Sequence, residues 1–348
     1  MNILLFPLAW LYGFFVAARN LAFDGGLLPQ RSVGVPVISV GNMTVGGTGK
    51  TPLVEFLVAL LLKRGRRVAV VSRGYGRRST GVVIVARGSG GGVLVDAAAG
   101  GDEPVQIARK FPGATVVVGE RRADAADVAV RCGADVIVLD DGFQHRSLRR
   151  NLDILVLDAR KDIAREPMLP AGRRREWLAG LWRADLLAFS RADEGGAPTW
   201  SEGLMKEFAG RTCSYRSRIT GFAAFDGSAK ALVSGKAFVF SGIGDHASFV
   251  QGVKEAGLHV AGDKRFRDHH NYSSGDVEEV VQRAEAAGAA TLITTEKDAV
   301  RLLAKEGAME RIGRGTSPVI ALLEVEMREG LHDLERAVDR CLESLSDP

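Results

Sequence analysis

A strand, a glycine-rich loop and the start of a helix follow one another in the segment VPVISVGNMTVGGTGKTP, residues 35–52. Residues 35–42 are β-branched and apolar without alternation, as in a parallel strand that is covered on both faces. After the loop, Thr51 can cap a helix, Pro52 suits its first turn, and apolar residues recur at helical spacing until Gly65. The segment therefore predicts an α/β sheet in which a buried strand delivers this loop.

The loop suits phosphate groups, although it departs from the pattern GxxxxGK[ST] by placing Thr44 where the first glycine belongs. Three glycines let the backbone approach a phosphate, and the N-terminus of the following helix favours an anion. Lys50 can reach the terminal phosphates, and the Thr51 hydroxyl can hold Mg²⁺. The expected ATP-binding residues are Thr44, Gly46, Gly47, Thr48, Gly49, Lys50 and Thr51. The alternative is a purely structural glycine turn.

Apolar strands and helical patterns alternate along the rest of the chain. The first series of expected strands is 67–72, 115–120, 135–141, 153–158 and 185–190, and a second series is 236–241, 291–295 and 318–325. This alternation predicts a doubly wound α/β sheet like that of phosphate-loop NTPases, with a second, smaller α/β unit. Two β-rich runs around GSGGG, in residues 81–96, predict an inserted β-hairpin. The predicted units are residues 1–30, 31–199 and 200–348.

Composition narrows the class of protein. A chain of 348 residues, 46% apolar and 25% charged, is long enough for about two domains. Its three cysteines lie far apart, which favours neither a disulfide framework nor a zinc site. The net charge of +4 is modest, but arginines cluster at 146–150 and 172–176. Such clusters suit an acidic ligand or a membrane surface, and a solvated basic face is the alternative.

The N-terminus is hydrophobic. Residues 3–18 carry no charge and are rich in aromatic side chains, and the run ends at Arg19. Sixteen helical residues reach about 24 Å, short of a hydrocarbon core of about 30 Å, so a spanning helix is not expected. A signal peptide would need a basic n-region and a small-residue cleavage site, which this segment lacks. We expect a monotopic helix in the membrane interface, with a helix packed on the protein's own core as the alternative.

Carboxylates and histidines supply further candidates. The strand DVIVLDDG ends in Asp140 and Asp141, which can bind Mg²⁺ beside the phosphate loop, although such a pair on its own is commonly a turn. GDEP places Asp102 near the N-terminus of a helix, where capping is the ordinary role. RFRDHHNY places His269 in a loop, where sharing a proton with a carboxylate suits it better than binding zinc.

Several classes of nucleotide-dependent protein fit this sequence poorly. Val45 stands where dimerising partition-type ATPases have their signature lysine. SRAD at 190–193 lacks the asparagine and lysine of a guanine reader, and TEKD at 295–298 has the wrong spacing. A phosphotransferase remains, and it needs an acceptor base and a substrate surface. A membrane-associated NTPase that acts as a conformational switch is the second hypothesis.

Seven motifs in order identify a resemblance: VGNMTVGGTGKTP, SRGYG, GDEP, LDDGFQH, LPAGRRRE, FRDHHNY and TTEKDAV. Together they resemble the tetraacyldisaccharide 4'-kinases of lipid A biosynthesis, from the N-terminus to about residue 303. The resemblance implies ATP- and Mg²⁺-dependent phosphorylation of the 4'-hydroxyl of a tetraacylated disaccharide 1-phosphate, forming lipid IVA. It implies the cytoplasmic face of a bacterial inner membrane as the location. The partners it implies are the lipid A disaccharide precursor and the membrane surface, with no nucleic acid and no obligate protein partner.

The resemblance also implies roles for individual residues. Asp102 resembles the general base, with His269 tuning it across a cleft. Asp140 and Asp141 would coordinate or orient the metal, with Glu103 in support. Four residues fall in family motifs near the active site and are candidate substrate contacts: Arg73, His145, Arg175 and Glu176.

Overall fold

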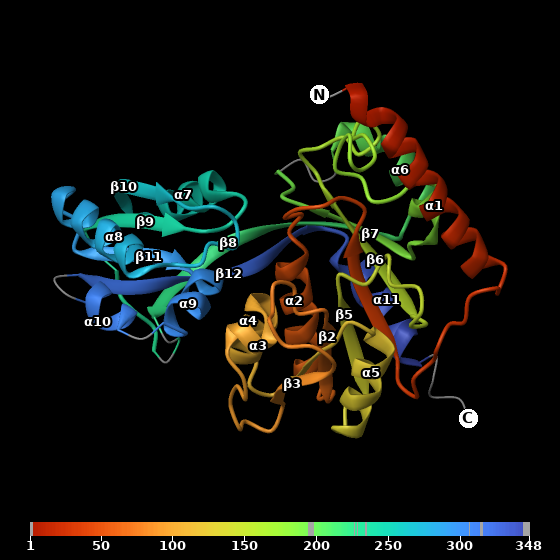
Figure 1. Cartoon of the computed structure of the whole chain (residues 1–348), viewed down its shortest axis with the longest axis horizontal. Helices are drawn as coiled ribbons and strands as arrows, with labels where there is room; N and C mark the ends of the chain where they lie inside the picture. Colours follow the sequence, from red (N-terminus) through yellow and green to blue (C-terminus); the bar gives the residue numbers. More distant parts are fainter. Residues whose placement is uncertain are drawn as a thin grey trace.

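The computed structural model describes residues 3–343 except 194–197, 226, 228, 234, 306 and 314–315, so the outermost residues of the predicted terminal units lie outside it. The described strands form one 12-stranded sheet in the order β10-β9-β11-β12-β8-β7-β6-β1-β5-β2-β4-β3 (Figure 1). Their bounds are β1 Val37–Asn42, β2 Val68–Ser72, β3 Val83–Arg87, β4 Thr115–Val118, β5 Val136–Asp140, β6 Leu152–Asp158, β7 Leu186–Ser190, β8 Thr212–Ala224, β9 Lys236–Ser241, β10 His259–Arg265, β11 Thr291–Thr295 and β12 Ser317–Glu329.

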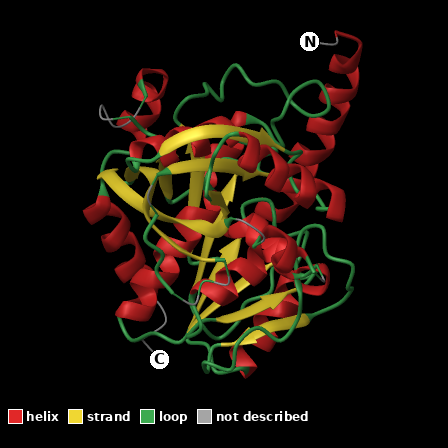
Figure 2. Cartoon of the chain, turned by 90° about the vertical axis from the view of Figure 1, so that its left-hand side faces the viewer, coloured by secondary structure: helices red, strands yellow, loops and turns green. Residues whose placement is uncertain are grey.

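Helices lie on both sides of these strands (Figure 2). The α-helices are α1 Phe6–Asp24, α2 Lys50–Lys63, α3 Ala97–Gly100, α4 Asp102–Lys110, α5 Arg122–Arg131, α6 Glu202–Glu207, α7 His246–Glu255, α8 Ser274–Ala286, α9 Glu296–Leu303, α10 Ala308–Ile312 and α11 Leu331–Glu343. Short 3₁₀ helices occupy Ile3–Leu5, Leu178–Arg183 and Thr199–Ser201. The predicted α/β class is confirmed.

The first unit is doubly wound around β1, and the alternation of side chains along this strand explains why. Ile38 and Val40 face a core that α2 and α4 cover, whereas Val37 faces the opposite core, which α5 covers. All six residues of β1 are buried, as expected for a strand between two helical layers. The loop that follows β1 therefore starts from a rigid position at the centre of the sheet.

Two long strands connect this unit to the second one. β8 and β12 pair antiparallel along most of their length, from Val319 opposite Ala224 to Glu329 opposite Ser214. At one end β8 pairs with β7, and at the other end β12 pairs with β11, so one sheet runs through both units (Figure 1). The second unit has its own two cores, covered by α8 to α10 on one face and by α7 on the other.

The last described helix returns to the first unit. Leu334, Val338 and Cys341 of α11 are buried in the same core as Ile38 and Leu57. Figure 1 shows α11 beside the strands of the first unit, away from the second unit that precedes it in sequence. The expected second unit, residues 200–348, therefore differs from the structure, because its C-terminal helix completes the first core.

The predicted hairpin in residues 81–96 forms only in part. Its first run is β3, which pairs antiparallel with β4 at the edge of the main sheet. The second run forms no strand, and its return is marked by a hydrogen bond from the Leu94 N–H to the Val85 carbonyl, at 2.8 Å. β3 is the edge strand of the sheet, and the second run lies against it as a loop.

The N-terminal helix α1 lies along the outside of the first unit (Figure 1). Ala9 and Gly13 form its buried contact, and a Cβ atom at Gly13 would lie 2.6 Å from the Trp177 ring. The rest of the helix is strongly exposed: Leu8, Trp10, Leu11, Phe14, Phe15 and Leu21 are each between 53% and 69% exposed. α1 is the one described helix long and apolar enough to cross a membrane. With only Ala9 and Gly13 buried, little of the helix packs on the protein's own core, which was the alternative expectation.

Candidate active site

The glycine-rich loop joins β1 to α2 at the centre of the sheet. Gly46 and Gly49 adopt positive φ angles of 96° and 79°, which side chains with a Cβ rarely tolerate. Gly49 is the N-cap of α2, so the expectation that Thr51 caps this helix is wrong, and Thr51 lies in the first turn instead. The Lys50 ammonium lies 3.3 Å from the Asp141 carboxylate, which joins the loop to the end of β5.

The arginine-rich segment 172–176 packs against the beginning of this loop. The Val45 N–H donates to the Arg173 carbonyl at 2.8 Å, and the Arg175 N–H donates to the Met43 carbonyl at 2.7 Å. Thr44 forms an antiparallel bridge with Arg174 between these two bonds. Because Thr44 is held in an extended ladder, it needs none of the conformational freedom of the glycine that the usual pattern has there.

The two aspartates at the end of β5 differ in ionisation. Asp140 is 8% exposed and accepts one long hydrogen bond, 3.4 Å from the Ser72 hydroxyl. Burial, together with the charge of Asp141, raises the pKa of Asp140 to about 6. Burial also opposes the ionisation of Asp141, but Lys50 and Arg175 outweigh it and lower its pKa. The Arg175 guanidinium lies 3.0 Å from the Asp141 carboxylate.

Asp102 and His269 meet across the two units. Asp102 is the first residue of α4, and its carboxylate lies 3.1 Å from His269 Nδ1 and 2.6 Å from the Arg301 guanidinium. Burial raises the pKa of Asp102, but the His269 hydrogen bond and the Arg301 charge outweigh it, so that the pKa is lowered. His269 adopts a positive φ of 57°, and the Tyr75 ring packs edge-on against it at 5.3 Å.

Glu103 makes a second connection between the units. Its carboxylate accepts a hydrogen bond from Lys297 at 2.5 Å, and Lys297 lies 3.2 Å from His269 Nε2. Burial raises the pKa of Glu103, but the Lys297 charge outweighs it. The charge of Glu103 is also one of the causes that raise the pKa of Asp140. Within the described residues, no three His, Cys, Asp or Glu side chains form a ready metal cluster.

Lys297 and Arg301 had no predicted role, although both lie in the motif-bearing segment around TEKD. They are four residues apart on α9, so they face the same side of one helix. Arg301 is anchored further by a hydrogen bond to the Gly242 carbonyl, at 3.0 Å. A lysine and an arginine at this spacing after a strand could have marked them as site residues. Their partners on α4, Glu103 and Asp102, lie nearly two hundred residues earlier in the chain.

The four candidate substrate contacts are not equally accessible. Glu176 is 1% exposed and accepts hydrogen bonds from Asn20, Gln144 and Arg183, which places it beneath α1. Arg175 is held by its bond to Asp141. The pKa of His145 is lowered to about 4 by burial and by the nearby charges of Arg122, Arg19 and Arg73, so its ring is neutral near pH 7.

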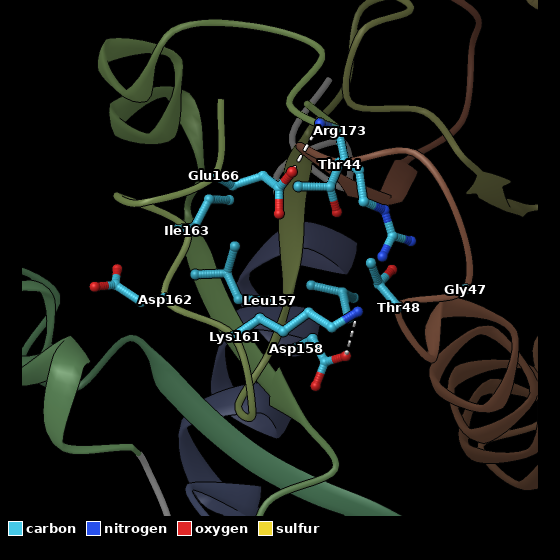
Figure 3. A pocket seen from close by; sticks show the side chains of 11 residues that line it. Thr44, Gly47, Thr48, Leu157, Asp158, Lys161, Asp162, Ile163, Glu166 and Arg173 are labelled. Atoms are coloured by element: carbon cyan, nitrogen blue, oxygen red, sulfur yellow. Dashed lines mark hydrogen bonds and ion pairs between the residues drawn. The ribbon is translucent and has the colours of Figure 1, made fainter. Parts of the chain in front are cut away.

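A pocket opens on the β6 side of the loop, opposite the aspartate pair. Thr44, Gly47 and Thr48 line it from the loop, and Asp158 at the end of β6 lines it together with Lys161 and Glu166 from the segment that follows (Figure 3). Arg173 reaches into the same space while its guanidinium donates to the Val45 carbonyl at 2.8 Å. Positive and negative side chains thus surround the loop on both flanks.

Comparison with known proteins gives a consistent result. The family model described as tetraacyldisaccharide-1-P 4'-kinase matches residues 1–343. A tetraacyldisaccharide 4'-kinase of Anaeromyxobacter sp. (strain K) is 40% identical over 342 residues, covering 95% of this chain and 88% of the relative. That of Chlorobium luteolum is 39% identical over 321 residues, covering 89% and 90%. A crystal structure of LpxK from Aquifex aeolicus in complex with ATP matches with a TM-score of 0.77 and 31% identity, covering 97% of this chain and 98% of that one.

Proposed function

This chain belongs to the tetraacyldisaccharide 4'-kinase family, and we propose that it transfers phosphate in the space between the glycine-rich loop, the aspartate pair and the Asp102–His269 contact. It is a kinase of lipid A biosynthesis that acts on a lipid disaccharide. The observation that supports the proposed location is the 3.1 Å contact between Asp102 and His269, which joins the candidate base in the first unit to its partner in the second.

ATP is proposed to bind with its phosphates in the loop. The main-chain N–H groups and the N-terminus of α2 favour an anion there, and Lys50 supplies a positive charge to the phosphate that is transferred. A magnesium ion fits the donor set, since Thr51, Asp140 and Asp141 offer hard oxygen ligands and Asp140 is a buried, under-bonded carboxylate. When bound, Mg²⁺ neutralises charge on the phosphate oxygens.

Asp102 is proposed to accept the proton of the sugar hydroxyl. As the 4'-oxygen bonds to the γ-phosphorus, the bond from that phosphorus to the bridging oxygen of ADP breaks, and the hydroxyl proton passes to Asp102. The lowered pKa of Asp102 keeps it ionised and ready to accept. Asp102 is held in position by His269 and Arg301, and His269 is held in turn by the Lys297–Glu103 pair. These charged groups surround Asp102 when the proton neutralises its carboxylate.

The exposed apolar side chains of α1 are proposed to lie in the cytoplasmic interface of the inner membrane. A helix that exposes large aromatic rings gains free energy when those rings leave water. Arg19, near its C-terminal end, suits the phosphate groups of the lipid surface. This placement would bring the proposed site to the membrane that carries the substrate.

The direct test is transfer of labelled phosphate from γ-labelled ATP to purified tetraacyldisaccharide 1-phosphate. Label is expected in the lipid with wild-type protein, and Lys50→Ala is expected to lose most transfer while keeping the fold. ATP hydrolysis that needs no lipid and leaves no label in it would instead favour the nucleotide-dependent switch. Wild-type turnover by a folded Lys50→Ala variant would remove the loop from the active site.

A further inference from the structure

Side chains from outside the glycine-rich loop hold four of its main-chain carbonyls. The Arg173 guanidinium donates to the Val45 carbonyl at 2.8 Å, and the Arg191 guanidinium donates to the Gly47 carbonyl at 2.9 Å. The Ser190 hydroxyl donates to the Thr48 carbonyl at 2.6 Å, and the Tyr215 hydroxyl donates to the Gly49 carbonyl at 2.8 Å. Ser190 ends β7 and Tyr215 lies opposite it in the register of β8. Three consecutive carbonyls are therefore bound by side chains at the end of β7, directly after it and within β8, and none of these residues belongs to the loop.

The carbonyl contacts bear on phosphate binding because a peptide unit is planar and trans. Its C=O and N–H groups point in opposite directions, so fixing the carbonyls of residues 47–49 outward turns the N–H groups of residues 48–50 toward the other side. Those N–H groups are the ones that an anion at the start of α2 needs. Among the described residues, the N–H groups of Thr48 and Gly49 donate to no protein acceptor.

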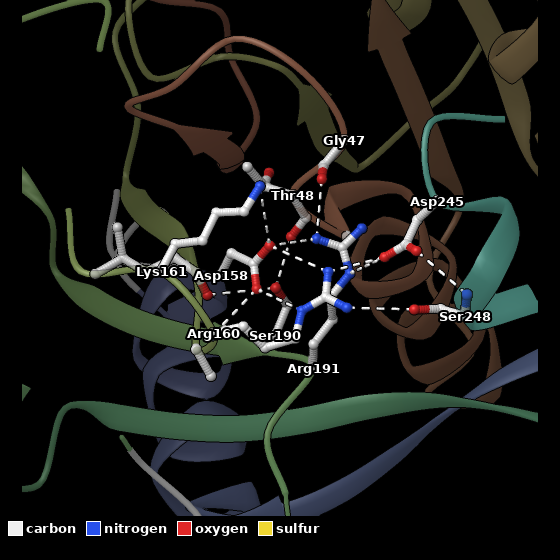
Figure 4. A network of polar contacts seen from close by, with 12 residues as sticks. Gly47, Thr48, Asp158, Arg160, Lys161, Ser190, Arg191, Asp245 and Ser248 are labelled. Carbon is white, nitrogen blue, oxygen red and sulfur yellow. Dashed lines mark hydrogen bonds and ion pairs between the residues drawn. The ribbon is translucent and has the colours of Figure 1, made fainter. Parts of the chain in front are cut away.

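Arg191 also links this arrangement to the second unit (Figure 4). It adopts a positive φ of 57°, and its guanidinium lies 2.6 Å from the buried Asp158 and 3.7 Å from Asp245. Asp245 precedes α7 in the second unit, where it accepts a hydrogen bond from the Ser248 N–H and lies 2.8 Å from Arg160. A single arginine thus touches the loop, the end of β6 and the second unit.

We propose that Ser190, Arg191 and Tyr215 are positioning residues for ATP: by binding the carbonyls of the loop, they orient its N–H groups toward the phosphates. Through its contact with Arg191, Asp245 makes this orientation depend on the second unit. The inference rests on the proposed binding of ATP phosphates in the loop, which the Lys50→Ala variant tests separately. Tyr215 is 1% exposed, so its hydroxyl has a fixed partner and no access to bulk water. ATP itself would be bound by N–H groups, and these side chains would act without touching it.

The hydroxyl variants separate positioning from ordinary packing. Tyr215→Phe and Ser190→Ala each remove a hydrogen bond to the loop, and Ser201→Ala is the matched control, because its buried hydroxyl donates to the Pro198 carbonyl at 2.6 Å outside the loop. Each loop variant is expected to raise the Kd and KM for ATP about 3- to 10-fold, as one lost hydrogen bond implies. Ser201→Ala is expected to leave both constants unchanged.

Thermal unfolding of the nucleotide-free protein supplies the second readout. If the hydroxyls merely satisfy buried groups, all three variants lower Tm alike and none changes ATP affinity, and the proposal fails. If the hydroxyls of Tyr215 and Ser190 position the loop, all three variants lower Tm to a similar extent, but only Tyr215→Phe and Ser190→Ala weaken ATP binding.

The Asp245 contact has its own test. Asp245→Asn is expected to raise the KM for ATP several-fold, and the double variant with Arg191→Ala is expected to be no worse than Arg191→Ala alone, since Asp245 acts through Arg191. Asp263→Asn is the control, because its carboxylate lies in the same unit and pairs with His246 at 2.9 Å. Multiplicative losses in the double variant, or an unchanged KM for Asp245→Asn, would overturn the link to the second unit.

Discussion

Asp140 combines burial with an almost unused hydrogen-bonding capacity, and its ionisation costs stability in the absence of a cation. Its pKa is raised from 3.8 to about 6, so the folded state holds the proton more tightly than the unfolded state does. The penalty is therefore absent below about pH 4, grows as the pH rises through 6, and is constant above that. A divalent ion that binds the carboxylate would remove it.

Asp140→Asn is accordingly expected to stabilise the metal-free protein at pH 8 by up to about 3 kcal/mol, since one pKa unit corresponds to about 1.4 kcal/mol. The gain should shrink toward zero near about pH 4.5 and should be smaller when wild-type protein is measured with Mg²⁺ and ATP. Urea unfolding across this pH range measures it, with the partly exposed Asp162→Asn as control. A constant advantage over the whole range would show that burial of the charge is not its source.

The Asp102–His269 contact makes a prediction about rate. Asp102→Asn keeps the size of the side chain but removes the base, so kcat is expected to fall about 10²- to 10⁴-fold with little change in ATP affinity. His269→Ala should also lower kcat, and the double variant should be scarcely worse than the more damaged single variant if the two act as one unit. Steady-state kinetics with both substrates checks this, and a fully active Asp102→Asn enzyme would eliminate the base.

At this scale the strand pattern alone predicts residues that follow a strand, whereas Asp102 and His269, which are far apart in the chain, were paired only through the resemblance to a family. Lys50 and Asp141 each lie next to a recognisable strand, and the structure brings them within 3.3 Å of each other. Lys297 and Arg301 were not predicted, because their meaning depends on α9 packing against α4. The hydrogen bonds from Ser190 and Tyr215 to the loop were not predicted either, because no sequence pattern shows which partner a hydroxyl on a buried strand will bind.

Among the elements, α1 has two faces with different expected roles. Leu11 and Phe14 are exposed, whereas Gly13 sits against Trp177 and Asn20 donates to Glu176 at 3.1 Å. Each exposed side chain of this kind contributes about 1.5–3 kcal/mol on leaving water. The double variant Leu11→Ser/Phe14→Ser is therefore expected to release the protein from phosphatidylethanolamine–phosphatidylglycerol vesicles in a flotation assay while keeping kcat on detergent-dispersed lipid.

The control lies on the other face of the same helix. Gly13→Leu would push α1 away from Trp177, so it should disturb the docking of the helix while leaving the vesicle-facing side chains in place. Unchanged vesicle binding by Leu11→Ser/Phe14→Ser would contradict the interfacial role. Unfolding of that variant would instead favour a helix that the protein's own core requires.

The sequence predicts the strands that are unbroken apolar runs, but it does not predict β8 and β10, whose runs are interrupted by polar residues. β8 (TCSYRSRITGFAA) and β10 (HVAGDKR) carry charged and small residues, because each has one partly exposed face. The second run of the expected hairpin contains apolar residues but forms no strand, although β3 at the edge of the sheet accepts a hydrogen bond from Leu94. Pairing in a sheet depends on neighbours in space, which a run of residues does not reveal.

For the whole molecule, the return of α11 makes this helix part of the core that carries the glycine-rich loop. Val338 is fully buried in the core beneath the loop, whereas Arg340 on the same helix is exposed. Val338→Asp is expected to destabilise the first unit by several kcal/mol and to abolish the rise in Tm that ATP produces, because it buries an unpaired charge. Arg340→Asp should leave both unchanged, and normal ATP binding by Val338→Asp would show that the loop does not depend on α11.

The position of α11 also bears on how the chain is made. In chain order α1 precedes all the described strands, whereas the core that supports the loop also needs residues 331–343, so α1 is synthesised well before that core can be completed. If α1 lies in the membrane interface as proposed, the nascent chain would meet a lipid bilayer before it is able to hold nucleotide, and a chain that ends before α11 is expected to reach the bilayer without binding ATP.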